Sequence, residues 1–259
     1  MHGRAGIWQT IFVCAAIFLL VGVLQAQEPI VIDFEDGSLD NWEVIDENPD
    51  NLGDKGPSTW EVRDSQLGLD GKALFQGSNI WGSAPDSCLM GTFIIYKGDQ
   101  FTDFTLDVDI AAADNDGIGF VWAFTGTDKH YRVIMINDKW PEVPVDGIRG
   151  PFLRIDKRIS DKEPWYEGLA VVKDNYKPYP EGPKFHCTLE VKNGVFKFER
   201  DDGLSITAED HTYQTGYVGI QLYAEQAEFD NFKITPLAPS AVRPSDKMAT
   251  IWGAIKEAY

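Results

Sequence analysis

The sequence has few basic residues and few of the side chains on which catalytic and metal-binding motifs depend. It holds 23 Lys and Arg against 41 Asp and Glu, with only three cysteines and four histidines. A net charge of −18 argues against nucleic-acid partners, because phosphates require a basic surface, and against docking on anionic lipid. Acidity of this degree fits an extracellular or saline setting, although it also serves solubility alone.

The common enzyme signatures are missing as well. The sequence contains no Gly-x-Ser-x-Gly elbow, no His-Glu-x-x-His motif, no phosphate-binding glycine loop and no Cys/His cluster with zinc spacing. From Ile30 to Thr235, no stretch shows the periodicity of an amphipathic helix. The sequence therefore predicts an all-β domain without a recognisable catalytic motif.

Only one long apolar run occurs, and it lies at the start of the chain. His2 and Arg4 precede an apolar stretch from Ile11 to Val23, and Leu24-Gln25-Ala26 follows, with the small residue Ala26 at the expected cleavage point. This pattern predicts a secretory signal peptide over residues 1–26, with an uncleaved anchor as the alternative. We therefore expect a protein that is secreted or held in the cell envelope, with no membrane span in the mature chain.

Cysteine is scarce enough for its pairing to be considered directly. Removal of the leader takes Cys14 away and leaves Cys88 and Cys187. In an oxidising compartment two remaining cysteines predict a disulfide. The alternative is two separate buried thiols.

The stretch from Phe101 to Asn137 predicts three successive strands joined by polar turns. Alternation with a period of two is typical of a strand with one buried and one wetter face. In the first strand Phe104, Leu106, Val108 and Ile110 share one face, and Thr105, Asp107 and Asp109 share the other. Further along, Asn193-Gly194 separates two alternating runs, which is a strong hairpin signal. These patterns predict an antiparallel β-sandwich.

The sandwich is expected to span residues 28–236. Within it, residues 38–57 are polar and rich in Gly, Asp and Asn, which predicts a loop. Residues 138–166 form a long proline-containing insertion with a short strand expected at 152–155, and loops this long are usually functional or mobile. Residues 237–259 predict a Pro-containing linker and a short amphipathic helix, which either docks on a partner or folds back on the sandwich.

Two groups of oxygen-bearing side chains suggest calcium, a cation that takes six to eight oxygen ligands. In jelly-roll sandwiches the first and last strands lie close together, which would bring Glu35 near Asp230. The second group is the turn Asp114-Asn115-Asp116. Solvated carboxylates in an Asx-type turn are the alternative at the second site.

A sugar-binding face is the main functional hypothesis. Flat aromatic rings beside polar side chains are what a sugar requires from a protein. If the strands pair as expected, Asp107 and Asp109 would share a polar face with Tyr217, Gln221 and Tyr223. Trp140 and Trp165 of the long insertion would then supply rings on which a sugar could stack. The expected ligand-binding residues are Asp107, Asp109, Arg132, Trp140, Trp165, Tyr217, Gln221 and Tyr223. The alternative is that these are ordinary surface side chains of a strand, together with loop residues that pack only on one another.

Catalysis at this face is the rival hypothesis. A glycosidase requires two carboxylates about 5–10 Å apart. Asp107 and Asp109 lie two residues apart on one strand face, at roughly that spacing. Their side chains are short, and no third acid follows them on that strand.

Asp103 to Asn137 resembles the C-terminal lectin-like domain of thrombospondins and related exported sandwich modules. The likeness rests on the acidic turn, on Gly-Ile-Gly-Phe-Val-Trp-Ala-Phe from Gly117, on Tyr131 to Met135, and on the closing strand Gly216 to Tyr223. It implies a concanavalin A-like jelly roll with bound calcium, in which Asp114, Asn115 and Asp116 match the acidic turn, and a role in matrix or cell-surface binding. The calcium-binding repeats that precede that domain in thrombospondins are absent here, so their adhesive partners are not implied.

Two further resemblances bear on function. The opening and closing strands look like those of carbohydrate-binding jelly rolls, which hold an ion near the positions of Glu35 and Asp230. The central strand is similar to that of exported keto-sugar hydrolases, whose catalytic residues have no match here. We thus expect a secreted, calcium-stabilised, non-catalytic module that binds glycans or glycoprotein surfaces. An exported glycoside or keto-sugar hydrolase and a structural surface or adhesion protein are the alternatives.

Overall fold

The computed structural model describes residues 27–47, 52–81, 91–139, 148–162 and 164–237. The expected signal peptide (1–26), Cys88, Trp140 and residues 238–259 of the expected tail lie outside these ranges, so the predictions about them stay predictions. In the part of the chain that is described, no helix has the length and apolarity needed to cross a membrane.

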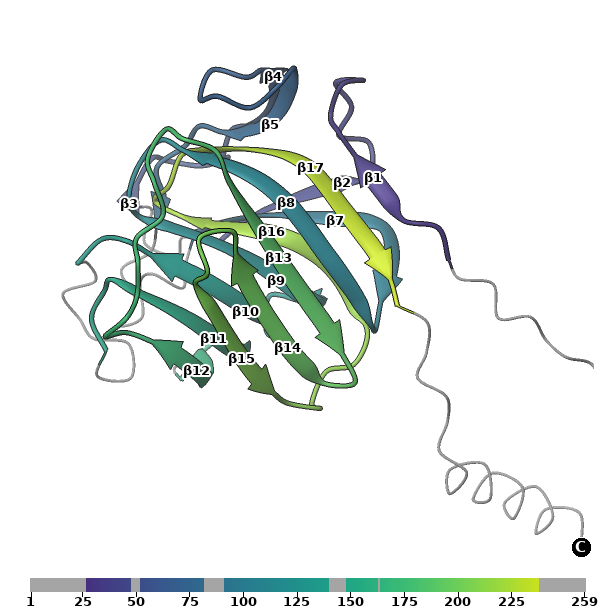
Figure 1. Cartoon of the computed structure of the whole chain (residues 1–259), viewed down its shortest axis with the longest axis vertical. Coiled ribbons are helices and arrows are strands. Elements are labelled where there is room, and N and C mark those ends of the chain that lie inside the picture. The colour runs from purple at the N-terminus through teal and green to yellow at the C-terminus, as the bar shows by residue number, and fades with distance from the viewer. Residues whose placement is uncertain (1–26, 48–51, 82–90, 140–147, 163, 238–259) are drawn as a thin grey trace, which may run out of the picture.

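Two antiparallel sheets form the domain (Figure 1). Sheet A has the strand order β15-β14-β13-β8-β17-β5-β4, with β1 also paired to β17, and sheet B has the order β12-β11-β10-β9-β16-β7-β2. The strands of sheet A are β1 (Ile30–Ile32), β4 (Trp60–Asp64), β5 (Lys72–Gln76), β8 (Phe104–Ala112), β13 (Phe185–Lys192), β14 (Val195–Arg200), β15 (Ser205–Glu209) and β17 (Ala227–Pro236). The strands of sheet B are β2 (Trp42–Asp46), β7 (Thr92–Phe101), β9 (Gly117–Gly126), β10 (Lys129–Ile136), β11 (Phe152–Arg158), β12 (Tyr166–Val172) and β16 (Gly216–Tyr223). β3 (Leu52–Gly53) and β6 (Ile80–Trp81) form a separate two-stranded sheet.

The predicted all-β sandwich and its central strands are confirmed. The three strands expected between Phe101 and Asn137 are β8, β9 and β10. The hairpin expected at Asn193-Gly194 joins β13 to β14, and the two turn residues have φ values of 51° and 75°. Asparagine and glycine tolerate these left-handed conformations better than other residues. The first and last strands also lie side by side, because Ile30 pairs with Ile234 (Figure 1).

The loop expected at 38–57 was wrong, whereas the strand expected at 152–155 is confirmed but is longer than predicted. The segment 38–57 contains β2, an edge strand that pairs only with β7. Its side chains are at most half-buried, so the apolar alternation on which strand prediction depends is weak. In the segment 138–166 the strand β11 runs to Arg158, beyond the expected 152–155. Four of its seven residues are charged, although all seven are buried, and charge of this density normally indicates a loop.

The main core lies between the two sheets. Alternate side chains of β8 and of β9 and β10 meet there, and all are almost fully buried: Phe104, Leu106, Val108, Ile110, Phe120, Trp122, Tyr131, Val133 and Met135. The residues between them in sequence therefore lie on the outer faces of the sandwich.

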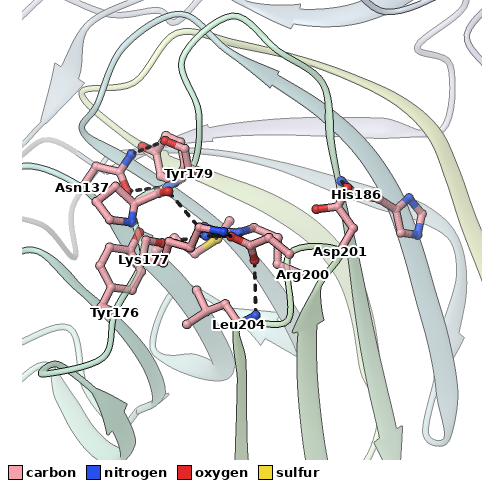
Figure 2. A network of polar contacts seen from close by, with 11 residues as sticks. Asn137, Tyr176, Lys177, Tyr179, His186, Arg200, Asp201 and Leu204 are labelled. Atoms are coloured by element: carbon pink, nitrogen blue, oxygen red, sulfur yellow. Dashed lines mark hydrogen bonds and ion pairs between the residues drawn. The ribbon is translucent and has the colours of Figure 1, made fainter.

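A buried polar network closes one end of this core. Figure 2 shows Tyr176 and Tyr179 beside Asn137, with Arg200 reaching toward the carbonyl oxygen of Lys177. Tyr176 donates to Asn137 Oδ1 at 2.6 Å, and Arg200 donates to that carbonyl at 2.6 Å and to Asp202 at 2.7 Å. The network fixes the connection between β12 and β13 against both sheets.

Candidate functional site

Sheet B is strongly curved, and its outer face is concave. Glu47 directly follows β2, at one edge of the sheet, whereas Arg158 ends β11, with β10, β9, β16 and β7 between them. Neighbouring strands lie about 4.8 Å apart, so a flat sheet would separate β2 from β11 by about 24 Å. Nevertheless Arg158 Nη1 donates to Glu47 Oε2 at 3.0 Å. Only a sheet that bends toward its outer face brings these side chains together.

Two glycines lie in the middle of this concave face. Gly119 pairs with Gln221 and Ile134, and Gly219 pairs with Val121. A Cβ atom on Gly119 would lie 2.5 Å from the carbonyl oxygen of Val133, and one on Gly219 would lie 2.5 Å from that of Ile94. Neighbouring backbone is too close for a side chain at either position, so the centre of the concave face is formed by bare backbone.

Charged side chains of β10 and β11 lie beside these glycines. Asp156 Oδ2 lies 2.5 Å from Arg132 Nη2, and Asp156 also forms an ion pair with Arg154. Arg132 Nη1 donates to Gln221 Oε1 at 3.2 Å. All these side chains are buried. Burial of charge is tolerated where ions are paired and hydrogen-bonded, so this group holds its members in fixed orientations.

Arg158 organises a second group at the side of the face. Its Nη atoms bond both oxygens of Glu47, Nη2 also lies 3.1 Å from Asp161 Oδ1, and Nε donates to the carbonyl oxygen of Ser160 at 2.6 Å. The guanidinium carbon lies 5.1 Å from the centre of the Trp165 ring and 5.0 Å from that of Tyr166. Burial raises the pKa of Glu47, and the bonds from Arg158 oppose that rise.

His130 contacts Tyr166, whose ring lies beside the Arg158 guanidinium. Its Nε2 lies 3.1 Å from the Tyr166 hydroxyl and its Nδ1 lies 3.2 Å from the carbonyl oxygen of Gly126. Burial lowers the pKa of His130 to about 3, so the ring is neutral at physiological pH. A neutral ring that donates from Nδ1 to a carbonyl accepts at Nε2, and the Tyr166 hydroxyl is therefore the donor to His130.

Apolar clusters flank the charged groups on both sides. One cluster contains Ile134, Ile136, Phe152, Tyr166, Tyr223 and Ala224, with Trp81, Ile148 and Trp165 packed against it. The other contains Phe93, Ile95, Val121 and Phe124, with Ile45 and Tyr217 packed against it. The concave face thus places buried, ion-paired groups between apolar clusters, and the rings of Trp165 and Tyr217 in these clusters are partly exposed to solvent.

The structure brings together some of the predicted ligand-binding residues and separates others. Arg132, Trp165, Tyr217, Gln221 and Tyr223 all belong to the concave face of sheet B. Tyr217 is half-buried there, with Lys97 Nζ 3.9 Å from its ring centre. Trp140 lies outside the described residues.

The predicted shared face of Asp107 and Asp109 with Tyr217, Gln221 and Tyr223 was wrong. Both aspartates lie on β8 of sheet A and point to the opposite side of the sandwich, because β8 pairs with β13 and β17 and not with β16. There Asp109 Oδ1 lies 2.7 Å from His186 Nδ1, and Asp107 accepts from Thr188 at 2.9 Å. Burial would raise the pKa of Asp109, but hydrogen bonds from His186 and Asn231 outweigh it, and the pKa is lowered.

The acidic turn expected to bind calcium is bonded instead to a buried glutamate. Glu225 accepts from the backbone N–H groups of Asp114 at 2.8 Å and Asp116 at 3.0 Å, and from the Tyr179 hydroxyl at 2.7 Å. Asn115 N–H donates to Asp114 Oδ1 at 2.8 Å. Burial, together with Asp114 and Asp138, raises the pKa of Asp116 to about 7.

The other expected calcium ligands also have protein partners. Glu35 Oε1 accepts from the backbone N–H of Lys72 at 2.8 Å, and Asp230 Oδ1 accepts from that of Asn231 at 2.6 Å. Burial, followed by Asp109, Glu35 and Asp33, raises the pKa of Asp230 to about 6. Within the described ranges, no group of three or more His, Cys, Asp or Glu side chains is arranged to hold a metal ion. Calcium binding stays a prediction.

Cys187 is buried, and it has no disulfide partner among the described residues. The expected partner, Cys88, lies outside the described residues, so the disulfide stays a prediction.

Sequence reasoning missed most of the charged groups on the concave face. Glu47, Arg154, Asp156 and Arg158 were not selected, and neither was the neutral His130. A signal existed on β11, where Phe152, Arg154, Asp156 and Arg158 alternate with Leu153, Ile155 and Lys157. No local signal could have linked Glu47 to Arg158, which is 111 residues away, because their contact depends on the curvature of the sheet.

No protein-family model matches the chain, and no curated protein matches its sequence. Among solved structures the chain is similar to the carbohydrate-binding module CBM66 from Bacillus subtilis, with a TM-score of 0.50, 19% identity and coverage of 74% of this chain and 94% of that one. It is also similar to a B. subtilis protein of unknown function with a galectin-like fold (TM-score 0.49, 12% identity, 77% and 90% covered) and to the exoplasmic/lumenal domain of VIP36 (0.48, 10%, 79% and 89%). At these identities the likeness concerns the fold alone, and the resemblance to thrombospondins stays a prediction. The chain therefore has a lectin-like jelly-roll sandwich fold.

Proposed function

We propose that the protein is an exported, non-catalytic module that binds glycans on the concave face of sheet B. The observation that carries this proposal is the group around Arg158, where Glu47, Asp161 and the Trp165 ring meet at the side of the face. A sugar is bound through flat aromatic surfaces and a few fixed polar groups. Both are present here, and ion pairs hold them in place before a ligand arrives.

The fold of the solved relatives adds support of a general kind. CBM66, which this chain resembles in fold, is described as a carbohydrate-binding module. An extracellular location is also proposed, on the basis of the leader-like residues 1–26 and the acidic composition.

Hydrolysis by Asp107 and Asp109 is the weaker proposal. A general acid requires a carboxyl group whose pKa is raised, whereas the pKa of Asp109 is lowered by its hydrogen bonds. The two aspartates also lie on the outer face of sheet A, away from the aromatic rings of the concave face. The third alternative, a surface protein held by its tail, depends on residues 238–259, which lie outside the described residues.

The test is a screen of the full chain against a glycan array and soluble polysaccharides, once with calcium and once with EDTA. Saturable binding to a sugar would support the proposed function. Loss of that binding in EDTA would show that binding depends on calcium, and unchanged binding in EDTA would show that it does not. No binding in either buffer, or release of reducing ends from a bound polysaccharide, would contradict non-catalytic glycan binding.

A further inference from the structure

We infer that the concave face selects neutral, hydroxyl-rich sugars over acidic ones, with Glu47 and Asp161 accepting hydrogen bonds from the ligand. This inference rests on the proposed function and names the class of glycan. It depends on which charged groups of the Arg158 group lie near solvent and which do not.

In the Arg158 group the positively charged side chain is buried, whereas the two negatively charged side chains reach solvent. The Arg158 side chain is 0% exposed, whereas that of Glu47 is 13% exposed and that of Asp161 is 56% exposed. Trp165, whose ring packs on the guanidinium, is partly exposed. A ligand that approaches from solvent therefore meets two carboxylates and an indole ring, and the positive charge lies beneath them.

The donors of Arg158 are directed at these carboxylates. Both Nη atoms bond Glu47 and one also bonds Asp161, while Nε donates to the carbonyl oxygen of Ser160. An arginine fork fits a carboxylate in this bidentate manner and fixes its orientation. Arg158 therefore orients the acceptors and does not serve as a receptor for an anionic ligand.

The loop that carries Asp161 and Trp165 is also held in position. The N–H of Ile159 donates to the carbonyl oxygen of Trp165 at 3.0 Å, which closes the β11–β12 connection. The Tyr213 hydroxyl donates to the carbonyl oxygen of Arg158 at 2.8 Å, and Lys162 N–H donates to Ser160 Oγ at 2.9 Å. Preorganised acceptors bind with a smaller loss of conformational entropy.

The groups that face solvent, Glu47, Asp161 and Trp165, favour a ligand whose hydroxyls donate hydrogen bonds. An ionised carboxylate only accepts hydrogen bonds, and the bonds that it accepts are stronger than those between neutral groups. Neighbouring hydroxyls of a sugar can donate to the two oxygens, and the Trp165 ring can cover the apolar side of the sugar. A uronate or sulfate would instead face like charges, in a chain whose net charge is −18.

The experiment compares neutral glycans with acidic forms of the same backbones, using the full chain. Dextran with dextran sulfate, and amylose with C6-oxidised amylose, are suitable probes beside an array that contains neutral, uronate and sulfated oligosaccharides. For the neutral ligand bound most tightly, D161N should weaken binding about tenfold, because a charge-assisted acceptor is replaced by an amide. D174N, which removes the same charge from an exposed position in the β12–β13 connection, should leave binding unchanged.

The outcomes separate this inference from the proposed function. Preference for the sulfated or uronate forms, or equal affinity of wild type and D161N for the neutral ligand, would overturn the inference while leaving glycan binding intact. No binding to any glycan would overturn both. E47Q is a second test of the inference. This variant should bind neutral glycans more weakly and should not gain affinity for the acidic forms.

Discussion

Glu47 and Arg158 form a bidentate ion pair across the concave face of sheet B, with Nη1–Oε2 and Nη2–Oε1 distances of 3.0 and 2.5 Å. The pair connects the segment after an edge strand with a strand five positions away in the same sheet. It is therefore both a consequence of the curvature of the sheet and a contact that stabilises it. The same pair sets the position of the acceptor oxygens that we assign to ligand binding.

Replacement of Glu47 by alanine should be strongly destabilising. The substitution leaves the Arg158 guanidinium buried without its bidentate partner, and breaking a buried pair costs about 3–5 kcal/mol. Glu43 on β2, the strand that Glu47 follows, provides a matched control. Its ion pair with Lys97 is half-exposed on both sides, so E43A should cost less than about 1 kcal/mol. Chemical denaturation gives both values, and equal losses for the two variants would show that the Glu47–Arg158 pair does not stabilise the face.

Stability should depend on pH through Asp116. Its pKa is raised to about 7 in the folded protein, so the folded state binds this proton more tightly than the unfolded chain, in which the carboxyl has an ordinary pKa of about 4. The stability linked to this proton is complete below about pH 4 and is lost as pH rises through about 7. D116N should therefore stabilise the protein at pH 8, by about 1 kcal/mol after allowance for screening.

The measurement for Asp116 is the free energy of unfolding at pH 5 and at pH 8. The gain from D116N should be larger at pH 8 than at pH 5. D70N removes an exposed acid elsewhere on the surface and should show no such difference. A gain that is the same at both pH values would mean that Asp116 does not titrate in this range.

Cys187 should react only after unfolding if its thiol is free. Burial raises the pKa of this thiol, so little thiolate is present and access is blocked. Alkylation without reduction, followed by peptide mapping, should leave Cys187 unmodified in the native protein and modified in denaturant. An unmodified Cys187 in denaturant, released only by a reductant, would instead establish a disulfide.

The sequence predicted the elements whose alternation is complete. The apolar faces of β8, β9 and β10 and the Asn193-Gly194 turn are local signals, and the structure confirms both. β2 was missed because an edge strand can be stable with few buried apolar residues. The length of β11 was underestimated because Arg154, Asp156 and Arg158 are charged, and their burial depends on partners supplied by other strands.

The candidate site was predicted only in part for a similar reason. Arg132, Trp165 and Gln221 were selected for their chemistry, and they belong to the concave face. Asp107 was predicted to lie beside them because its strand was assumed to belong to the same sheet as the strand of Gln221. Alternation shows which residues of a strand share a face, but it does not show to which of two sheets the strand belongs.

The most direct test of the account compares substitutions on the two sides of the sandwich. Isothermal titration with the glycan identified by the array would give Kd for W165A, on the concave face of sheet B, and for the double variant D107N/D109N, on the outer face of sheet A. Thermal unfolding would confirm that each variant is folded. The account predicts that W165A loses at least about tenfold in affinity, because the ring is a stacking surface, and that D107N/D109N binds like the wild type. Loss of binding in D107N/D109N with unchanged binding in W165A would contradict it and place the glycan on sheet A.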